Sequence, residues 1–526
     1  MTQADTTTTI IDELTRIAGP EAVLTDEASR QFYSQDIYSR SMPVLAVVRP
    51  TDTAQLAQLV ACATQAGHAV ITRGGGMSYT GGYLAAEPDS ILIDIQRLDR
   101  IIEINRQDMY VTVECGCTWK QLHEALQGSG LRTPYWGTLS GIKATVGGGL
   151  SQNSIFWGSG RYGSAVDSVL SLEVVLADGS VVNTGSDAKR GGSPFFRYYG
   201  PDLTGLFCCD TGALGIKTRA TLRLIPDYEV RRGASFDFKT HAQLVQAMSE
   251  IAREDLAMEC FAFDPYLQRQ RMIRESVRQD VKALGAVMKA SGSVLNALKE
   301  GTKLVTAGRG FMDEVDYSLH IMIEERQDST ADAALARVEA ICRQHEGRQI
   351  EASIPTLLRA NPFTPLNNVV GPGGERWVPI HVLVPHSRVT DMIEAVEKVF
   401  ADNHALVQQH QIGVGFLYAT VATGCFIIEP VFFWPDALME IHRDTIEPAV
   451  LKKLKGYEAN SAASEAVAGL RQTLIDLFSE AGGIHLQIGK SYRYRDGIEA
   501  SAWAVVEGIK RLLDPDNRIN PGSLGL

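Results

Sequence analysis

The feature that most limits how this chain can fold is a glycine-rich stretch between two apolar segments. Residues 71–82 read ITRGGGMSYTGG, in which five of the twelve residues are glycine. The apolar segments at 69–71 and 91–95 are typical of β-strands. Glycines here can serve a tight turn that requires positive φ. They can equally allow backbone N–H groups to converge on an anion such as a diphosphate. The stretch therefore predicts either a strained turn or a nucleotide cofactor bound between two strands.

Length and charge exclude several classes of protein. A chain of 526 residues is too long for one hydrophobic core, so we expect two or three domains. The net charge of −12 argues against nucleic acid as a partner and against a polybasic membrane contact. No apolar run approaches the length of a membrane span, and the N-terminus lacks the pattern of a signal peptide. The eight cysteines form no CxxC pair, which disfavours zinc and a disulfide scaffold. We expect a cytoplasmic protein.

The order of strand and helix patterns predicts two folded regions. Residues 44–226 alternate short strands with helices at 53–63 and 118–126, and form one α+β unit in this interpretation. Asp52 or Thr51 is the expected N-cap of the first of these helices. In the second region we predict helices at 265–284 and 330–345 and strands at 317–323 and 377–384. A helix at 499–512 precedes a turn-rich tail.

Four stretches together point to a known family. They are TRGGGMSYTGG (72–82), ATVGGGLSQNSIFWGSGRYG (144–163), DLTGLFCCDTGALGIKTRATLRLIP (202–226) and LLDPDNRINPGSLG (512–525). Neither a Walker A motif nor a Rossmann fingerprint is present. The chain resembles the vanillyl-alcohol oxidase / p-cresol methylhydroxylase (PCMH-type) family of FAD flavoproteins. The resemblance covers residues 44–226 and the last fifteen residues.

The resemblance implies an α+β fold with a two-subdomain FAD-binding domain and a substrate cap. The cap is expected to be α+β as well, with a ferredoxin-like sheet and helices. We place an N-terminal helical segment at 1–43, the FAD-binding domain at 44–228, the cap at 229–480, and a C-terminal segment that returns to the FAD domain at 481–526.

The resemblance also implies which residues bind FAD. Glycine N–H groups would approach the diphosphate, Ser78 and Ser151 would add hydroxyl donors, and Asn520 would lie where the tail meets the flavin. The implied cofactor-binding residues are Arg73, Gly74, Gly75, Gly76, Met77, Ser78, Tyr79, Gly82, Thr145, Gly147, Gly148, Ser151, Asn153, Gly158, Tyr162, Gly163, Gly212, Gly215, Ile216 and Asn520. Many relatives attach FAD through a histidine, but neither matching stretch here contains one, so we expect non-covalent FAD.

Two branches of the family remain as alternatives. The sequences of the glycine loops are more similar to those of the D-lactate and glycolate dehydrogenases, which usually hold a metal. In the matching places Gln411 and Tyr418 stand where two histidines are expected, so we predict no metal. Tyr79 favours the vanillyl-alcohol and eugenol oxidases, because that branch binds a phenol with a tyrosine near this position. The pair Tyr492-Arg493 lies several residues later than the tyrosine-arginine pair of that branch.

We expect a FAD-dependent oxidoreductase that removes a hydride from a hydroxyl-bearing or para-phenol-activated carbon of a small molecule. His485 is the candidate general base, and Tyr79, Tyr492 and Arg493 are the other catalytic candidates. Arg359 and Lys490 are candidates for binding a substrate anion. Oxygen, a cytochrome or a quinone would accept the electrons, and a homodimer is common in such relatives. A non-redox synthase or an inactive FAD-binding homologue are the alternatives from other classes.

Overall fold

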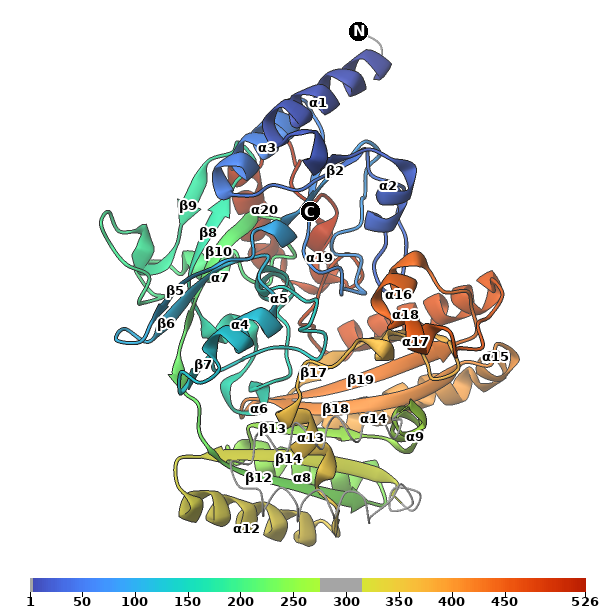
Figure 1. Cartoon of the computed structure of the whole chain (residues 1–526). Helices are drawn as coiled ribbons and strands as arrows, with labels where there is room; N and C mark the ends of the chain where they lie inside the picture. Colours follow the sequence, from blue (N-terminus) through green and yellow to red (C-terminus); the bar gives the residue numbers. More distant parts are fainter. Residues whose placement is uncertain (1–2, 275–314) are drawn as a thin grey trace. The chain divides into compact units, whose positions relative to one another are not determined.

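The computed structural model describes residues 3–274 and 315–526 and divides the chain into two compact units (Figure 1). The first unit contains Met1–Ile155, Ser164–Pro226 and His485–Leu526, and the second contains Phe156–Gly163 and Asp227–Ile484. We predicted the boundary between the FAD-binding domain and the cap at 228/229, and the structure divides the chain at 226/227. The segment 156–163, which we placed in the FAD-binding domain, groups with the second unit.

A four-stranded sheet in the first unit leads into the first glycine loop. Its strand order is β1-β2-β4-β3, and β4 runs parallel to both β2 and β3. Every residue of β4 is buried, which explains why its first three residues are apolar. The helix α3 begins after Asp52, whose carboxylate accepts a hydrogen bond of 2.8 Å from the N–H of Gln55. The bounds are β1 Val23–Leu24, β2 Ala46–Val48, α3 Thr53–Gln65, β3 Val70–Arg73 and β4 Ile91–Asp94.

A five-stranded antiparallel sheet forms the other half of the first unit. Its order is β5-β6-β10-β8-β9, so β5 and β9 are its edge strands. The turn between β5 and β6 is closed by Asn105, whose side chain accepts from the N–H of Asp108 at 2.8 Å. The bounds are β5 Ile101–Asn105, β6 Tyr110–Glu114, α4 Trp119–Leu126, α5 Val146–Gln152, β8 Val169–Val175, β9 Val181–Asn183, α7 Leu203–Leu206 and β10 Ile216–Arg223. The remaining elements of this unit are α1 Gln3–Ala18, α2 Glu27–Tyr33, β7 Leu131–Arg132, β11 Ile225–Pro226, α19 Tyr494–Gly497 and α20 Ala500–Leu513.

The C-terminal tail adds to the edge of the four-stranded sheet. Ile519 pairs in parallel with Val70 of β3. The N–H of Val70 donates to the carbonyl of Arg518 at 2.7 Å, and the N–H of Asn520 donates back to the carbonyl of Val70 at 2.9 Å. Residues that lie far apart in the sequence are therefore neighbours beside the first glycine loop.

A buried lysine fixes this tail to the rest of the unit. The ammonium group of Lys510 donates to Asp514 at 2.6 Å, to the carbonyl of Ile519 at 2.7 Å and to the carbonyl of Ala213 at 2.8 Å. Burial lowers the pKa of Lys510, whereas the carboxylate of Asp514 acts in the opposite direction. A buried ammonium is tolerated only when its donors are used, so these three bonds hold the tail in one position.

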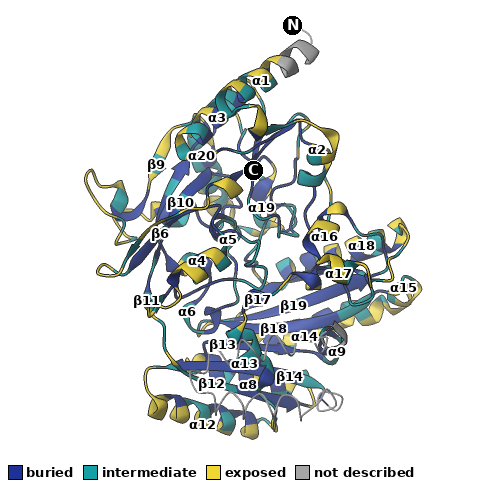
Figure 2. Ribbon diagram, viewed as in Figure 1, coloured by how far each residue is buried: buried dark blue, intermediate teal, exposed yellow. Residues whose placement is uncertain are grey.

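The second unit is built on an eight-stranded antiparallel sheet. Seven of its strands follow the order β15-β12-β14-β13-β18-β19-β16, and β17 also pairs with β19. The helices α8, α12, α14 and α18 pack on this sheet, and Figure 2 shows its central strands as buried. The strands are β12 Val230–Phe238, β13 Glu259–Phe263, β14 Tyr317–Glu325, β15 Arg348–Ile350, β16 Arg376–Pro379, β17 Val382–Val384, β18 Gly413–Val421 and β19 Cys425–Trp434. The helices are α6 Ser159–Tyr162, α8 His241–Arg253, α9 Pro265–Arg274, α12 Asp328–Gln344, α13 Ser353–Ala360, α14 Val389–Asp402, α15 His404–Gln409, α16 Glu440–Thr445, α17 Pro448–Leu451 and α18 Ser461–Glu480.

Two predicted elements of the second region differ from the structure. The single strand predicted at 377–384 is two strands, β16 and β17, because the ladder with β19 is interrupted opposite Pro430, a residue without a backbone N–H. The helix predicted at 265–284 is present as α9 up to Arg274, and its second half lies outside the described residues. Among the helices of residues 3–274 and 315–526, none is long and apolar enough to cross a membrane.

Candidate functional site

The first glycine loop, residues 74–82, begins where β3 ends and packs tightly against the second glycine region. A Cβ atom on Gly75 would lie 1.8 Å from the carbonyl oxygen of Lys143. A Cβ on Gly74 would lie 2.3 Å from the hydroxyl of Thr145. Gly76 has a φ of +71°, a conformation that residues with side chains rarely adopt. Glycine is therefore required here by close backbone packing as well as by the turn.

Residues outside the loop hold it in place. The buried carboxylate of Asp36 accepts a hydrogen bond of 2.8 Å from the N–H of Gly81. The guanidinium of Arg73 lies 4.8 Å from the ring centre of Tyr33 and 5.5 Å from that of Tyr83, so it is held by cation–π contacts. Arg73 was predicted to bind the cofactor, but the structure places its charged group among these rings.

The second glycine region forms the start of α5. Thr145 is the N-cap, and its hydroxyl accepts a hydrogen bond of 3.2 Å from the N–H of Gly148. A Cβ on Gly147 would lie 2.6 Å from the Cβ of Cys115, and only glycine permits this approach. At Gly148 the nearest atom to such a Cβ is the hydroxyl of Thr145 itself, at 3.1 Å.

A buried ion pair shapes the third loop. The carboxylate of Asp210 and the ammonium of Lys217 lie 2.7 Å apart, and their side chains are only 1% and 2% exposed. Asp210 also accepts a hydrogen bond of 2.9 Å from the N–H of Gly212. Gly212 has a φ of +72°, and a Cβ there would meet no atom closer than 3.9 Å, the side-chain nitrogen of Asn520.

Asn520 joins the tail to the glycine loops. Its side-chain N–H groups donate to the carbonyl of Gly82 at 2.8 Å and to the carbonyl of Thr211 at 2.7 Å. Its side-chain oxygen is buried and, among the described residues, has no hydrogen-bond partner. Asn520 therefore holds the first and third loops together and retains an unused acceptor.

The three loops enclose one cavity of about 1000 Å³, counting the space open to solvent. Most of the predicted cofactor-binding residues line it, namely Gly74, Gly75, Gly76, Met77, Ser78, Tyr79, Gly82, Thr145, Gly147, Gly148, Ser151, Gly212, Gly215 and Ile216. Asn520 contacts two residues of its wall through the bonds described above. Asn153 instead ends α5 in a left-handed conformation, with a φ of 52°. Gly158, Tyr162 and Gly163 belong to the second unit.

Several residues of the cavity wall were not predicted from the sequence. They are Thr72, Tyr83, Ile95, Thr138, Ser140, Ala144, Gly149, Gln152, Ser154, Thr211, Lys217 and Gln487. Most of them are close in sequence to a glycine-rich stretch, and this closeness could have indicated that they line the cavity. Thr138 and Ser140 lie just before the second glycine region. Gln487 comes from the tail, and no local pattern distinguishes it.

The residues of the cavity fit a dinucleotide cofactor such as FAD. At Gly212, which lines the cavity, the protein leaves the position of a side chain open, because a Cβ there would meet no atom closer than 3.9 Å. The side-chain oxygen of Gln152, which also lines the cavity, is buried without a hydrogen-bond partner among the described residues. Bare backbone at the wall, together with unused polar atoms, is the arrangement expected where a large polar ligand completes the packing. Gly74, Gly75 and Gly76 of the first loop are the residues expected to approach the diphosphate of FAD.

The predicted catalytic histidine lies on a segment that borders this cavity. The rings of His485 and Tyr492 are stacked, with centres 3.7 Å apart and planes 15° from parallel. The same segment is tied to the loops, since the N–H of Lys490 donates to the carbonyl of Thr80 at 2.9 Å. Arg493, predicted to act beside Tyr492, is exposed.

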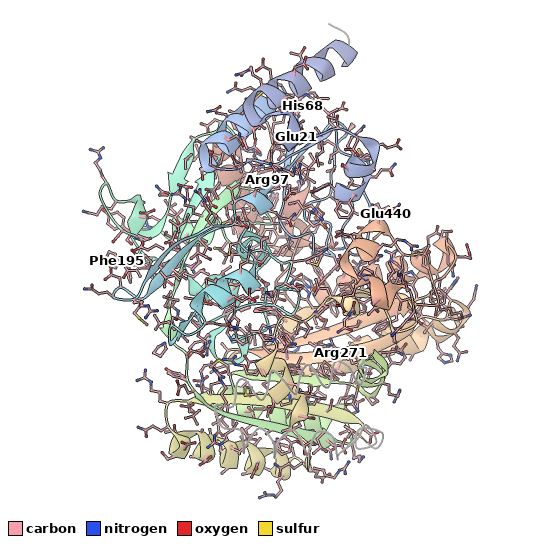
Figure 3. The ribbon with its side chains drawn as sticks, in the orientation of Figure 1. Glu21, His68, Arg97, Phe195, Arg271 and Glu440 are labelled. Carbon is pink, nitrogen blue, oxygen red and sulfur yellow. The ribbon has the colours of Figure 1, made fainter. Side chains whose placement is uncertain are left out.

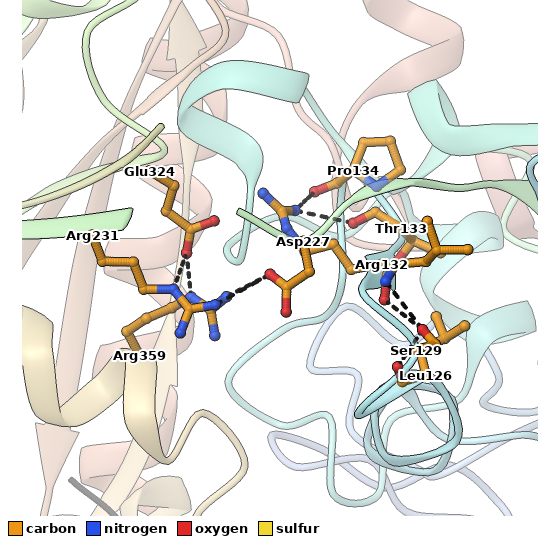
Figure 4. Close-up of polar contacts among 10 residues, drawn as sticks. Leu126, Ser129, Arg132, Thr133, Pro134, Asp227, Arg231, Glu324 and Arg359 are labelled. Atoms are coloured by element: carbon orange, nitrogen blue, oxygen red, sulfur yellow. Dashed lines mark hydrogen bonds and ion pairs between the residues drawn. The ribbon is translucent and has the colours of Figure 1, made fainter. Parts of the chain in front are cut away.

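The two cations that we considered for binding a substrate anion have other partners. The ammonium of Lys490 donates to the carbonyl of Leu84 at 2.5 Å, and burial lowers its pKa to about 8. The guanidinium of Arg359, in the second unit, pairs with the buried carboxylate of Glu324 and lies 3.3 Å from Asp227 (Figure 4). Arg231 lies 3.4 Å from the same Glu324 carboxylate. Arg359 is therefore part of an ion-pair network within the second unit.

A second polar cluster lies on the sheet of the second unit. His320 of β14 is completely buried and its ring nitrogens lie 2.9 Å from the hydroxyl of Ser235 and 3.1 Å from that of Ser318. Burial lowers the pKa of His320 to about 3, so it is neutral and structural.

Burial raises the pKa of Glu429 on β19 to about 7, although the guanidinium of Arg271 (Figure 3) acts in the opposite direction.

The raised pKa of Glu429 predicts that its replacement stabilises the protein at high pH. An acid whose pKa rises from 4.5 to about 7 on folding lowers the stability of the protein as the pH rises from about 4.5 to about 7, and this loss is complete above pH 7. We expect Glu429→Gln to raise the free energy of unfolding by about 1–3 kcal/mol at pH 8 and to have little effect at pH 4.5. Urea unfolding at the two pH values measures this. Glu394→Gln, at an exposed position on α14, is the control and should change neither value. An equal effect of Glu429→Gln at both pH values contradicts the prediction.

Titratable side chains elsewhere give no sign of a metal site in the part of the chain that the structure describes. Within residues 3–274 and 315–526, no group of three or more His, Cys, Asp or Glu side chains is arranged to hold a metal ion. All eight cysteines lie within these ranges, and none of them forms a disulfide.

Comparison with known proteins relates the chain to FAD-binding oxidoreductases. Residues 44–185 match the FAD binding domain family. The chain is 22% identical to the glycolate oxidase subunit GlcD of Bacillus subtilis, over 98% of this chain and 96% of that protein. It is 31% identical to a probable mitochondrial D-lactate dehydrogenase of Danio rerio, over 46% of this chain and about half (49%) of that protein. Its fold is similar to that of substrate-bound p-cresol methylhydroxylase, with a TM-score of 0.75, 16% identity, and coverage of 100% of this chain and 98% of that one.

The sequence match and the fold agree with the geometry of the cavity. The matched FAD-binding residues include the first two glycine regions, whose backbone forms much of the cavity wall. The expected α+β fold with a PCMH-type FAD-binding domain is confirmed. Residues 44–185 form an FAD binding domain, and the chain is a FAD-dependent oxidoreductase whose fold is similar to that of p-cresol methylhydroxylase.

Proposed function

We propose that this chain oxidises a small phenol at a carbon attached para to the hydroxyl group, such as that of a benzylic alcohol. The observation that carries this proposal is the position of Tyr79, which lines the cavity together with Gln487 of the C-terminal segment. The stacked pair His485 and Tyr492 lies on that same segment. A tyrosine hydroxyl and an imidazole supply the donor and the base that oxidation of a phenolic alcohol requires.

Each of these side chains has a proposed role. FAD, when bound, supplies the acceptor for the hydride that leaves the substrate carbon. The Tyr79 hydroxyl donates a hydrogen bond to the phenolic oxygen and stabilises negative charge there. His485 accepts the proton from the substrate hydroxyl, since a neutral imidazole is a suitable base near neutral pH. Tyr492 fixes the orientation of the imidazole through the stack.

Oxidation of a 2-hydroxy acid is the second candidate. It is favoured by the similarity to the glycolate oxidase subunit, which extends over 98% of this chain. A carboxylate substrate needs a cation to bind it. Of the three cations considered, Arg359 and Lys490 are engaged elsewhere and Arg493 is exposed. These positions support the phenol over the hydroxy acid.

Further properties of the enzyme are part of the same proposal. FAD is held without a covalent bond, since the side chains that line the cavity within the described residues include neither histidine nor cysteine. The acceptor of the electrons is oxygen, a cytochrome or a quinone, and the location is the cytoplasm. The substrate is a small molecule.

Anaerobic bleaching of the bound flavin tests the choice of substrate. We expect vanillyl alcohol or eugenol to bleach the flavin, and D-lactate and glycolate to leave it oxidised. Tyr79→Phe should slow bleaching by a phenol at least tenfold, about 1.4 kcal/mol in transition-state free energy, because the bond to the phenolic oxygen is lost. Tyr198→Phe removes a hydroxyl from an exposed tyrosine and serves as the control. Bleaching by the hydroxy acids alone would refute the phenol proposal.

A further inference from the structure

Thr211, in the wall of the FAD cavity, has a backbone conformation that its side chain disfavours. Its φ is +53°, and Cys209 before it and Gly212 after it are also left-handed, with φ of +56° and +72°. Glycine adopts this conformation without cost, whereas a β-branched residue such as threonine rarely does. Strained residues persist where the surrounding contacts fix them, and they gather at functional sites. A threonine at this position therefore needs a role that glycine cannot fill.

Three separate segments of the first unit fix Thr211 in this conformation. The N–H of Thr211 donates to the carbonyl of Ser151 on α5 at 2.9 Å. Its carbonyl accepts a hydrogen bond of 2.7 Å from the side chain of Asn520 in the tail. Its hydroxyl oxygen accepts a bond of 3.3 Å from the N–H of Gly489, on the segment that follows Gln487. The position of this side chain in the cavity wall is therefore set before any cofactor binds.

The hydroxyl of Thr211 keeps one unused hydrogen-bond donor. The residue is only 4% exposed, so water has little access to it. Its oxygen accepts the bond from Gly489, but no acceptor for its O–H is present among the described residues. A hydroxyl group is both a donor and an acceptor, and a buried donor that finds no partner costs free energy. Because Thr211 lines the cavity, a molecule bound there can supply the missing acceptor.

The contact with Gly489 indicates which part of FAD this hydroxyl meets. Gly489 lies on the C-terminal segment that also carries Gln487 of the cavity wall and the stacked rings of His485 and Tyr492. A hydride moves from the substrate to the isoalloxazine ring, so this ring belongs near the residue that accepts the substrate proton. This step rests on the role proposed above for His485. We propose that the hydroxyl of Thr211 donates a hydrogen bond to the isoalloxazine ring of FAD and favours its reduced form.

The charge of the ring explains why the bond favours reduction. Reduction adds electrons to the isoalloxazine, and its ring oxygens and nitrogens become more negative. A hydrogen bond to a negatively charged acceptor is about twice as strong as a bond to a neutral one. The donor is held in place from three sides, so it needs no reorganisation when the charge develops. Thr211 is thus expected to bind reduced FAD more tightly than oxidised FAD.

The midpoint potential of the bound flavin tests the proposal. It is measured on the holoprotein by equilibration with a dye of known potential, without substrate, and titration of the apoprotein gives the dissociation constants of oxidised and reduced FAD. We expect Thr211→Val to weaken binding of reduced relative to oxidised FAD about tenfold, which lowers the potential of a two-electron couple by about 30 mV. Thr211→Ala removes the hydroxyl without keeping a branched side chain in the left-handed region, and it should give the same change.

Two variants serve as controls. Thr211→Ser keeps the hydroxyl and should retain the wild-type potential. Thr221→Val on β10 removes another buried hydroxyl, which lies 2.9 Å from that of Thr112 and does not line the cavity. This variant should also retain the wild-type potential, whatever its effect on the melting temperature.

Three results would overturn the assignment. An unchanged potential in Thr211→Val and Thr211→Ala shows that the hydroxyl does not meet the isoalloxazine ring. Equal weakening of oxidised and reduced FAD leaves Thr211 with the structural role of anchoring Gly489. An equal fall in Thr221→Val attributes the change to the loss of any buried hydroxyl. Because the potential is measured without substrate, this proposal and the choice of a phenol as substrate fail or succeed independently.

Discussion

Gly212→Ala is expected to leave the chain largely without FAD, with the dissociation constant of FAD raised at least tenfold. A Cβ at this position would meet no protein atom closer than 3.9 Å, so it would extend into the cavity that the three glycine loops enclose. The loss would therefore come from the space that the cofactor needs. The ratio of flavin absorbance to protein absorbance after purification, followed by titration of the apoprotein with FAD, measures the effect.

A second glycine provides a matched control for this variant. Gly212 has a φ of +72°, so alanine also introduces backbone strain of about 1 kcal/mol there. Gly128 has a φ of +73°, and a Cβ there would meet no atom within 4 Å, but this residue does not line the cavity. Gly128→Ala thus introduces the same backbone strain, but its Cβ does not extend into the cavity. If the two variants lose FAD equally, the cavity is not the FAD site.

His485→Asn is expected to slow anaerobic flavin reduction by about 10²- to 10⁴-fold, the usual contribution of a general base. FAD binding should persist, because His485 lies beside the cavity and does not form its wall. Asparagine retains a polar group of similar reach but cannot accept the proton at neutral pH. Stopped-flow reduction by the best phenolic substrate, followed between pH 5 and 9, measures both the rate and its pH dependence.

The control for this prediction is an exposed histidine. His404→Asn on the second unit replaces the same type of side chain at a surface position, and its flavin should be reduced at the wild-type rate. A wild-type rate in His485→Asn, with FAD bound, would assign the stack with Tyr492 a purely structural role. Loss of FAD from this variant would show that the histidine supports the cofactor site.

Much of the FAD site was predictable because its chemistry is local. The glycine loops are defined by consecutive residues that must bring bare backbone together, and fourteen of the predicted residues line the cavity. The N-cap of α3 could be narrowed to Thr51 or Asp52 because capping acts within three residues, and the structure shows that it is Asp52. The prediction was wrong where the decisive contact comes from a distant part of the chain. The segment 377–384, predicted as one strand, forms two strands because each pairs with a different part of β19.

The charged residues show the limit of local reasoning most clearly. Arg73 directly precedes the first glycine loop, yet its guanidinium packs against the rings of Tyr33 and Tyr83. Arg359 was a candidate for binding a substrate anion, yet its guanidinium forms ion pairs with Glu324 and Asp227. A long, charged side chain reaches several ångströms from its backbone, so its partner depends on which segments the fold brings near it.

The glycine loops could be located from the sequence because consecutive glycines are a local feature, and FAD could be predicted because four stretches together resemble a family of FAD proteins. Only the tertiary structure decided which polar groups complete the cavity. Gln487 comes from the C-terminal segment and was not predicted. Asn520 was implied by the resemblance, but its side chain reaches the first and third loops because the tail pairs with β3 and Lys510 fixes it there. Such positions are set by long-range packing and buried hydrogen bonds, which leave no periodic pattern in the sequence.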